Sequence, residues 1–275
     1  MEIRKNSGAV KWILITISAL FLVVMLILPL IYIIFTAFRD GIQAYITAVT
    51  DEYARKAVML TLEATLWSVG LNTVFGICAA WCITKFNFKG KKVVSTLIDL
   101  PLTVSPIIAG LIYVLTFGRQ SFLYDYLKSA GITIIFAVPG VILATIFVTF
   151  PFISREIIPV LTAQGTDEEE AAALMGAGTF TIFRKVTFPH IKWALLYGIV
   201  LCTARAMGEF GAVSVLSGHL RGKTNTMPLY IELLYQGYDF TGAFAMSSLL
   251  VVMAVIILAL RSILEYKGKK STSEN

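Results

Sequence analysis

The chain has 275 residues, of which 57% are hydrophobic and only 15% are charged, and its formal net charge is +6. A mean hydropathy of +0.80 excludes an ordinary soluble domain, and long apolar stretches leave too little chain for a soluble catalytic domain. We therefore predict an all-α integral membrane protein that is not itself an enzyme.

Six apolar stretches are each long enough for one bilayer crossing, which takes about 20 residues. They lie at 12–38, 56–83, 93–117, 132–153, 193–216 and 240–260. An even number of crossings puts both chain ends on one side of the membrane. The first stretch has 27 residues, which is too long for a cleaved signal peptide, so we predict an uncleaved first helix.

Lys and Arg are divided unevenly between the two predicted sides of the membrane. The N-terminus, the loop at 85–92, the loop at 154–192 and the tail together carry 15 of them, whereas the opposite side carries 7. Cytoplasmic loops are rich in Lys and Arg, so both termini and the 154–192 loop are predicted to be cytoplasmic. The same asymmetry, with attraction to anionic lipid head groups, accounts for the net charge without nucleic acid.

The 154–192 loop contains a short predicted helix with an acidic start. Acidic side chains are favourable in a first turn, where the helix dipole is positive, and Thr166 is the predicted cap. Alanines favour a slim helix, and Gly176 and Gly178 are predicted to end it, so the helix can fit a partner's cleft. A solvated charged loop is the usual alternative for such a run.

The order of residues in this loop resembles the cytoplasmic signature of bacterial ABC-importer permeases. That signature is Glu-Ala-Ala, three residues, Gly, nine residues and Ile-x-Leu-Pro; here Glu170-Ala171-Ala172 and Gly176 precede Val186-Thr187-Phe188-Pro189. Only the Ile and Leu positions differ, and both replacements are apolar. The resemblance implies contact with a separate ATPase through Gly165, Thr166, Asp167, Glu168, Glu169, Glu170, Ala171, Ala172, Gly176 and Pro189.

This chain has no convincing nucleotide-binding loop of its own. The nearest match, from Gly218 to Thr224, has three residues between its glycines where a phosphate loop has four. No cofactor or metal is expected in this chain, and ATP with Mg is expected on the partner ATPase.

An ionisable pair lies inside the fifth apolar stretch. Arg205 is near the middle of a predicted helix of 24 residues, where an ionisable group costs about 2.5–3.5 kcal/mol, so it must face protein or water. Glu209 lies one turn further on the same face, so an ion pair is available. Two interpretations stay open: a structural lock between helices, or a cation on the path of an oxyanion.

Residues 204–239 resemble the fifth-span region of sulfate/thiosulfate importer permeases of the CysW type, and the resemblance covers about residues 55–262. The core of this match is shared with molybdate and CysT-type permeases, and the following stretches at 211–218 and 221–224 are more specific. Candidate residues of the translocation path or ion-pair lock are Arg205, Glu209, Thr103, Ser105, Thr203, Ser214 and Ser217.

The resemblance implies the fold of a type-I ABC importer permease. Such an importer is expected to move sulfate or thiosulfate across the bacterial inner membrane by alternating access. Its implied partners are two ATPase copies, a second permease that is a CysT-type chain or a second copy, an external sulfate/thiosulfate-binding protein and membrane lipid. The predicted parts are 1–54 with the first helix, 55–262 as the transmembrane domain with the coupling loop 154–192, and 263–275 as a basic tail. The alternatives are a molybdate or tungstate permease and an ion-coupled secondary transporter.

Overall fold

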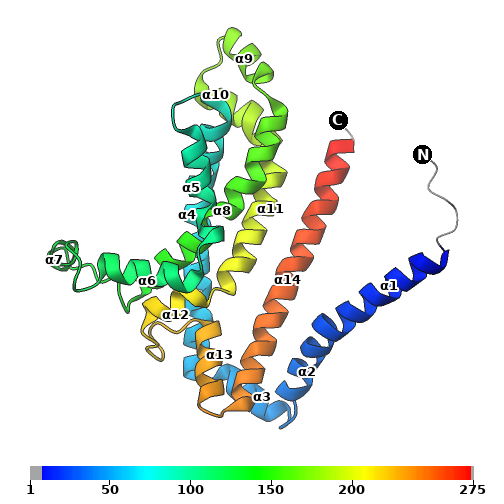
Figure 1. Cartoon of the computed structure of the whole chain (residues 1–275), viewed down its shortest axis with the longest axis vertical. Helices are drawn as coiled ribbons and strands as arrows, with labels where there is room; N and C mark the ends of the chain where they lie inside the picture. The colour runs from blue at the N-terminus through cyan, green and yellow to red at the C-terminus, as the bar shows by residue number, and fades with distance from the viewer. Residues whose placement is uncertain (1–7, 274–275) are drawn as a thin grey trace. The chain divides into compact units, whose positions relative to one another are not determined.

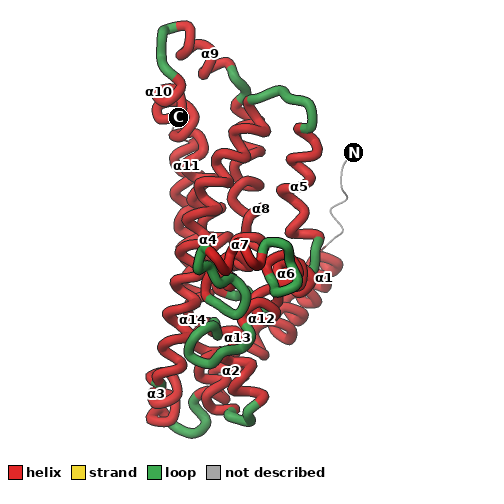
Figure 2. The backbone as a smooth tube through the Cα atoms, turned by 90° about the vertical axis from the view of Figure 1, so that its left-hand side faces the viewer, coloured by secondary structure: helices red, strands yellow, loops and turns green. Residues whose placement is uncertain are grey.

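The computed structural model describes residues 8–273, with side chains described for residues 10–265. The first seven residues, with the predicted basic Arg4 and Lys5, and the last two residues of the predicted tail lie outside the described residues. All regular structure between residues 8 and 273 is helical, as Figure 2 shows, so the all-α prediction is confirmed.

The helices are labelled in chain order in Figure 1. They are α1 (Gly8–Leu22), α2 (Leu28–Ala37), α3 (Ile42–Thr50), α4 (Glu52–Lys85), α5 (Lys91–Thr103), α6 (Pro106–Phe117), α7 (Tyr124–Ser129), α8 (Val138–Gln164), α9 (Asp167–Leu174), α10 (Thr179–Ile182), α11 (Phe188–Met207), α12 (Gly211–Ser217), α13 (Met227–Gln236) and α14 (Phe240–Ser273). Short π-helical turns, η1 (Val23–Ile27) and η2 (Phe183–Thr187), precede α2 and α11.

Five helices in the described part are long and apolar enough to cross a membrane. They are Val10–Ala37, Glu52–Lys85, Val138–Gln164, Thr179–Met207 and Phe240–Glu265. The third predicted span is instead a pair of helices, because the chain bends by 109° between α5 and α6. This pair provides a sixth crossing only if it counts as one span. Pro106 explains the bend, since the residue before a proline avoids helical dihedrals and Ser105 has a ψ of 132°.

The chain forms two compact units, one of which comprises the chain up to Asp51 and Ile231–Val252. In this unit the rings of Phe38 and Tyr45 stack with centroids 4.4 Å apart. The Thr241 hydroxyl donates a hydrogen bond to Asp40, and Ser248 donates one of 3.2 Å to the Tyr45 hydroxyl. None of the apolar window in Val10–Ala37 is buried within the chain, a pattern typical of a helix that faces lipid.

The second unit, Glu52–Tyr230 with Met253–Asn275, carries the candidate site. Its centre is a bundle of α4, α8 and α11, which lie side by side in Figures 1 and 2. Gly76 and Gly198 let these helices approach closely: a Cβ added at Gly76 would lie 2.8 Å from an Ile153 side-chain carbon, and one at Gly198 would lie 3.1 Å from its Cα. Small residues at such crossings are typical of helix packing in membranes.

A polar contact ties the same three helices together in the interior. The fully buried Asn72 on α4 donates hydrogen bonds to the Thr149 hydroxyl, 2.8 Å away, and to the Ile146 carbonyl on α8, 3.2 Å away. Its amide nitrogen also lies 3.9 Å from the sulfur of Cys202 on α11. Buried polar side chains need such partners, so these contacts specify which faces of the helices meet.

Candidate functional site

The predicted short helix of the 154–192 loop is present as α9, between α8 and α10 (Figure 1). Two residues separate it from the end of α8, and the first of them, Gly165, has a φ of +71°. It ends in a Schellman motif: the Ala177 N–H donates to the Ala172 carbonyl at 3.0 Å, and the Gly176 N–H donates to the Ala173 carbonyl at 2.9 Å. Gly176 has a φ of +85°, which favours glycine, so local chemistry defines both ends of α9.

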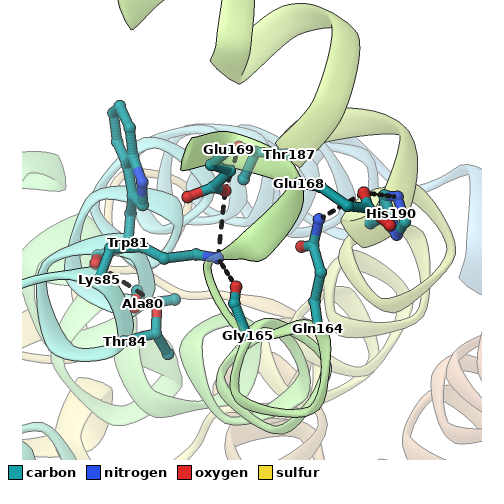
Figure 3. Close-up of polar contacts among 10 residues, drawn as sticks. All are labelled: Ala80, Trp81, Thr84, Lys85, Gln164, Gly165, Glu168, Glu169, Thr187 and His190. Atoms are coloured by element: carbon teal, nitrogen blue, oxygen red, sulfur yellow. Dashed lines mark hydrogen bonds and ion pairs between the residues drawn. The ribbon is translucent and has the colours of Figure 1, made fainter. Parts of the chain in front are cut away.

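One acid of the first turn, Glu169, turns back toward the helical bundle (Figure 3). Its carboxylate lies 3.1 Å from the Lys85 ammonium at the end of α4 and accepts a hydrogen bond of 2.6 Å from the Thr187 hydroxyl. The Lys85 ammonium also donates to the Gly165 carbonyl. The two charged side chains are only 6% and 14% exposed, and Thr187 is fully buried.

A second acid, Glu168, makes contacts that are open to solvent (Figure 3). Its carboxylate lies 3.0 Å from His190 Nε2 on α11 and accepts a hydrogen bond of 3.4 Å from Gln164. Thr166 stands at the predicted cap position, but its side chain makes no capping hydrogen bond, so that part of the prediction is wrong. Its carbonyl instead accepts the Glu170 N–H at 2.9 Å, which is the first backbone bond of the helix.

The tip of this segment exposes large apolar side chains. Leu174 is 91% exposed, Met175 is 82% exposed and Phe180 on α10 is 76% exposed, and we call these three residues the apolar tip. On α9 the charged Asp167 and Glu170 are exposed, as is Ala171, whereas Ala172 is buried, and Pro189 is exposed in the first turn of α11. Apolar side chains gathered on a polar loop are typical of a surface that binds another protein.

The predicted ion pair is present, but its helix is not continuous. Arg205 Nη1 lies 2.7 Å from Glu209 Oε2, with the Arg205 side chain 33% exposed and that of Glu209 1% exposed. The predicted single helix over 193–216 is wrong, because α11 ends at Met207 and α12 starts at Gly211. Glu209 lies in the break, where its other oxygen accepts the Ala212 N–H at 2.8 Å and replaces a lost intrahelical bond.

The break between α11 and α12 lies against the break between α5 and α6. A Cβ added at Gly211 would lie 2.9 Å from Pro106, and one at Gly110 would lie 2.7 Å from the Ala212 carbonyl oxygen. The exposed Thr103 and Ser105 flank the α5–α6 bend, so two predicted path residues lie beside the second break.

Most of the predicted path hydroxyls are engaged within the fold, including that of Thr103, which donates to the Leu100 carbonyl at 2.9 Å. Thr203 donates to the Ile199 carbonyl and Ser214 to the Gly211 carbonyl, each at 2.8 Å. Ser217 is fully buried and accepts the His219 N–H at 3.2 Å, so it is not on a surface of this chain.

Two ion pairs in the fold, Lys85–Glu169 and Arg155–Asp99, were not predicted from the sequence. In the sequence, Lys85 resembles the other lysines of the loop that follows it, and none of its neighbours indicates a partner as remote as Glu169. Arg155 falls in the predicted 154–192 loop and Asp99 in the predicted span 93–117, but they lie within α8 and α5, where the Arg155 Nε is 2.9 Å from Asp99 Oδ1. In the described part of the chain, no three His, Cys, Asp or Glu residues gather as metal ligands.

Long apolar helices, two interrupted helices in contact and an ion pair in one break define a multi-pass membrane protein with the features of a transporter. The chain belongs to the family of binding-protein-dependent transport system inner membrane components, whose family model matches residues 72–270.

Individual relatives agree with this family. The chain is 47% identical over 257 residues to the sulfate transport system permease protein CysW of Escherichia coli strain K12, covering 94% of this chain and 88% of that one. It is 34% identical over 236 residues to a probable sulfate transport system permease protein cysT of Helicosporidium sp. subsp. Simulium jonesii, covering 86% and 87%. The resemblance to CysW-type permeases is therefore confirmed.

The fold is similar to that of a solved transporter. A chain in the crystal structure of a bacterial alginate ABC transporter, in complex with an alginate pentasaccharide-bound periplasmic protein, matches with a TM-score of 0.77. The match covers 94% of this chain and 96% of that chain at 20% sequence identity, which supports the type-I ABC permease fold. The family and the sulfate permease relatives make the chain a permease subunit of an ABC importer, and the solved structure shares its fold.

Proposed function

We propose that this chain is the CysW-type half of a permease that imports sulfate or thiosulfate across the bacterial inner membrane by alternating access. The greater identity to a CysW protein than to a CysT protein supports this half over the other. A CysT-type chain is then the second permease, two ATPase copies bind ATP and Mg, and an external binding protein delivers the anion. Two permease halves that rock against each other explain how one chain of this size contributes to a gated path.

The apolar tip is the observation that carries the coupling part of this proposal. The exposed side chains are those of Leu174, Met175 and Phe180. Contacts of Glu169 with Lys85 and Thr187 fix the start of α9, so these apolar side chains are presented in a defined position. Burying them in a cleft of the ATPase removes apolar area from water, and the exposed Asp167 and Glu170 supply charges at the rim. ATP-driven movement of the ATPase then moves α9.

The breaks between α5 and α6 and between α11 and α12 support the proposed position of the anion path. Thr103 and Ser105 are exposed hydroxyl residues at one break, and the partly exposed Arg205 lies at the other. Neutral hydroxyl donors bind a dianion weakly enough to release it, while Arg205 adds an attractive charge that Glu209 partly neutralises.

The experiment reconstitutes the complete importer in proteoliposomes and measures ATP-dependent uptake of labelled sulfate, with thiosulfate, molybdate and tungstate as competitors. Leu174→Glu and Phe180→Glu are expected to abolish ATPase binding and uptake. The matched control is Phe122→Glu, which makes the same change as Phe180→Glu at a side chain that is 90% exposed elsewhere in the chain. Wild-type uptake in Leu174→Glu contradicts the coupling role, and molybdate uptake without sulfate uptake contradicts the substrate.

A further inference from the structure

The exposed tip depends on how α9 is held, and Lys85 is bound at the joint between α8 and α9. That joint consists of Gly165 and Thr166, and a positive-φ glycine without a Cβ restrains it little. Lys85 contacts both the joint and the helix that follows it: its ammonium donates to the Gly165 carbonyl within the joint and pairs with Glu169 in the first turn of α9 (Figure 3). A single side chain from α4 therefore holds the point about which α9 would turn and the start of α9 itself.

The same carboxylate binds the third helix of the bundle. Thr187 is the last residue of the π-turn that leads directly into α11, and its hydroxyl donates to Glu169 Oε1, the same oxygen that faces Lys85. Lys85, Gly165, Glu169 and Thr187 form what we call the α9 anchor. Through it, the cytoplasmic ends of α4, α8 and α11 all converge on the first turn of α9.

Burial distinguishes the anchor from the neighbouring Glu168–His190 contact. The anchor charges are 6% and 14% exposed, so water screens their attraction weakly, and removing one charge leaves the other buried without its counter-charge. His190 and Glu168 are 42% and 55% exposed, and exposed pairs contribute little. The orientation of α9 is accordingly set by Glu169 and not by Glu168.

We propose that Lys85 is a positioning residue that fixes α9 to the end of α4, so that movement of a docked ATPase is transmitted to α4 together with α8 and α11. This inference rests on the proposed function, because it assigns a route for the coupling described there. Without the Lys85 ammonium, α9 turns about Gly165 while the ATPase stays docked, and hydrolysis proceeds without moving the bundle.

The test uses the complete importer and two measurements. The first measurement is the number of ATP molecules hydrolysed per sulfate imported. We expect Lys85→Gln to raise this ratio about fivefold or more, which corresponds to the lower end of typical coupling energies. The second is the electron–electron distance between spin labels at the exposed positions Lys89→Cys and Ala173→Cys, with the exposed Cys78 and Cys82 replaced. Its distribution is expected to be narrow in the wild type and broad in Lys85→Gln.

His190→Gln is the matched control and is expected to change the ratio by less than about twofold and to leave the distance distribution narrow. If Lys85→Gln retains the wild-type ratio and a narrow distribution, the proposal is wrong. If Lys85→Gln fails to assemble, the variants Thr187→Ser and Thr187→Val provide the test. Only Thr187→Val, which removes the hydroxyl, is expected to raise the number of ATP molecules hydrolysed per sulfate. Equal numbers in the two variants overturn the proposal.

The failure of this inference is distinguishable from failure of the proposed function. A wild-type importer that hydrolyses ATP but moves no sulfate contradicts the proposed substrate, whereas the spin-label distances still report whether Lys85 positions α9. Sulfate uptake by the wild type with no effect of Lys85→Gln contradicts the anchor alone.

Discussion

Glu209 connects two helix ends with one carboxylate. One oxygen lies 2.7 Å from Arg205 in the last turn of α11, and the other accepts the Ala212 N–H of α12 at 2.8 Å. A structural lock here does more than an ion pair along a continuous helix, because it fixes the end of α11 to the start of α12 across the break. The partly exposed Arg205 still has surface available to an anion, so a structural and a transport role are compatible in one residue.

Arg205→Ala is expected to destabilise the subunit more than Glu209→Ala does, because it leaves the Glu209 carboxylate, which is 1% exposed, without its counter-charge. Leaving a buried charge uncompensated typically costs about 3–5 kcal/mol, whereas Glu209→Ala leaves the Arg205 side chain, which is 33% exposed, in contact with its surroundings outside the chain and removes one hydrogen bond to Ala212. Thermal unfolding of the purified complex measures both effects. A larger loss in Glu209→Ala than in Arg205→Ala contradicts this order.

The double variant Arg205→Ala/Glu209→Ala separates the two roles of Arg205. A pure lock predicts that removing both charges recovers much of the stability and some uptake, as a double-mutant cycle measures. A path cation predicts normal assembly and ATP hydrolysis without sulfate uptake. Near wild-type uptake in a well-assembled Arg205→Ala importer excludes both.

At the scale of elements, α6 and α12 can cross closely only because glycine stands at the contact. A Cβ at Gly110 would lie 2.7 Å from the Ala212 carbonyl oxygen and 3.0 Å from Val215 Cβ, and backbone atoms cannot move aside cheaply. Gly110→Ala is expected to cost about 1–3 kcal/mol through overpacking. Gly70→Ala on α4 is the control, since a Cβ there meets nothing within 4 Å and is expected to be neutral or stabilising.

Unchanged thermal stability in Gly110→Ala, measured beside Gly70→Ala, contradicts the close crossing of α6 and α12. A loss of stability in both variants points to a general intolerance of these helices and not to the contact.

Element by element, the sequence was informative where structure is determined locally. The acids that open α9 and the glycine that closes it act within a few residues, so both ends were predictable. The breaks at Ser105 and at 208–210 were not, because apolar composition continues across them and prolines in membrane helices often only kink the helix. The Lys85–Glu169 contact was hidden for another reason: it joins segments that are adjacent only after α4 and α8 have packed.

At the scale of the whole molecule, the distribution of charge predicts how the chain crosses the membrane. The 154–192 loop, with its apolar tip, lies on the side with 15 Lys and Arg, and the side with 7 includes Lys223. Coupling to an ATPase requires the first side to be cytoplasmic, so orientation and function depend on each other. A chain inserted the other way would present the tip to the external binding protein.

Cysteine labelling tests this orientation directly, with a membrane-impermeant thiol reagent applied to intact cells and to inverted vesicles. Lys89, Thr179 and Lys223 are suitable positions because all three side chains are exposed in the chain. We expect Lys89→Cys and Thr179→Cys to react only from the cytoplasmic face, and Lys223→Cys only from outside, because the Lys and Arg bias orients the spans. The parent chain needs its exposed Cys78 and Cys82 replaced, while the buried Cys202 can remain. Labelling of Thr179→Cys from outside would overturn the orientation and, with it, the role of α9 in coupling.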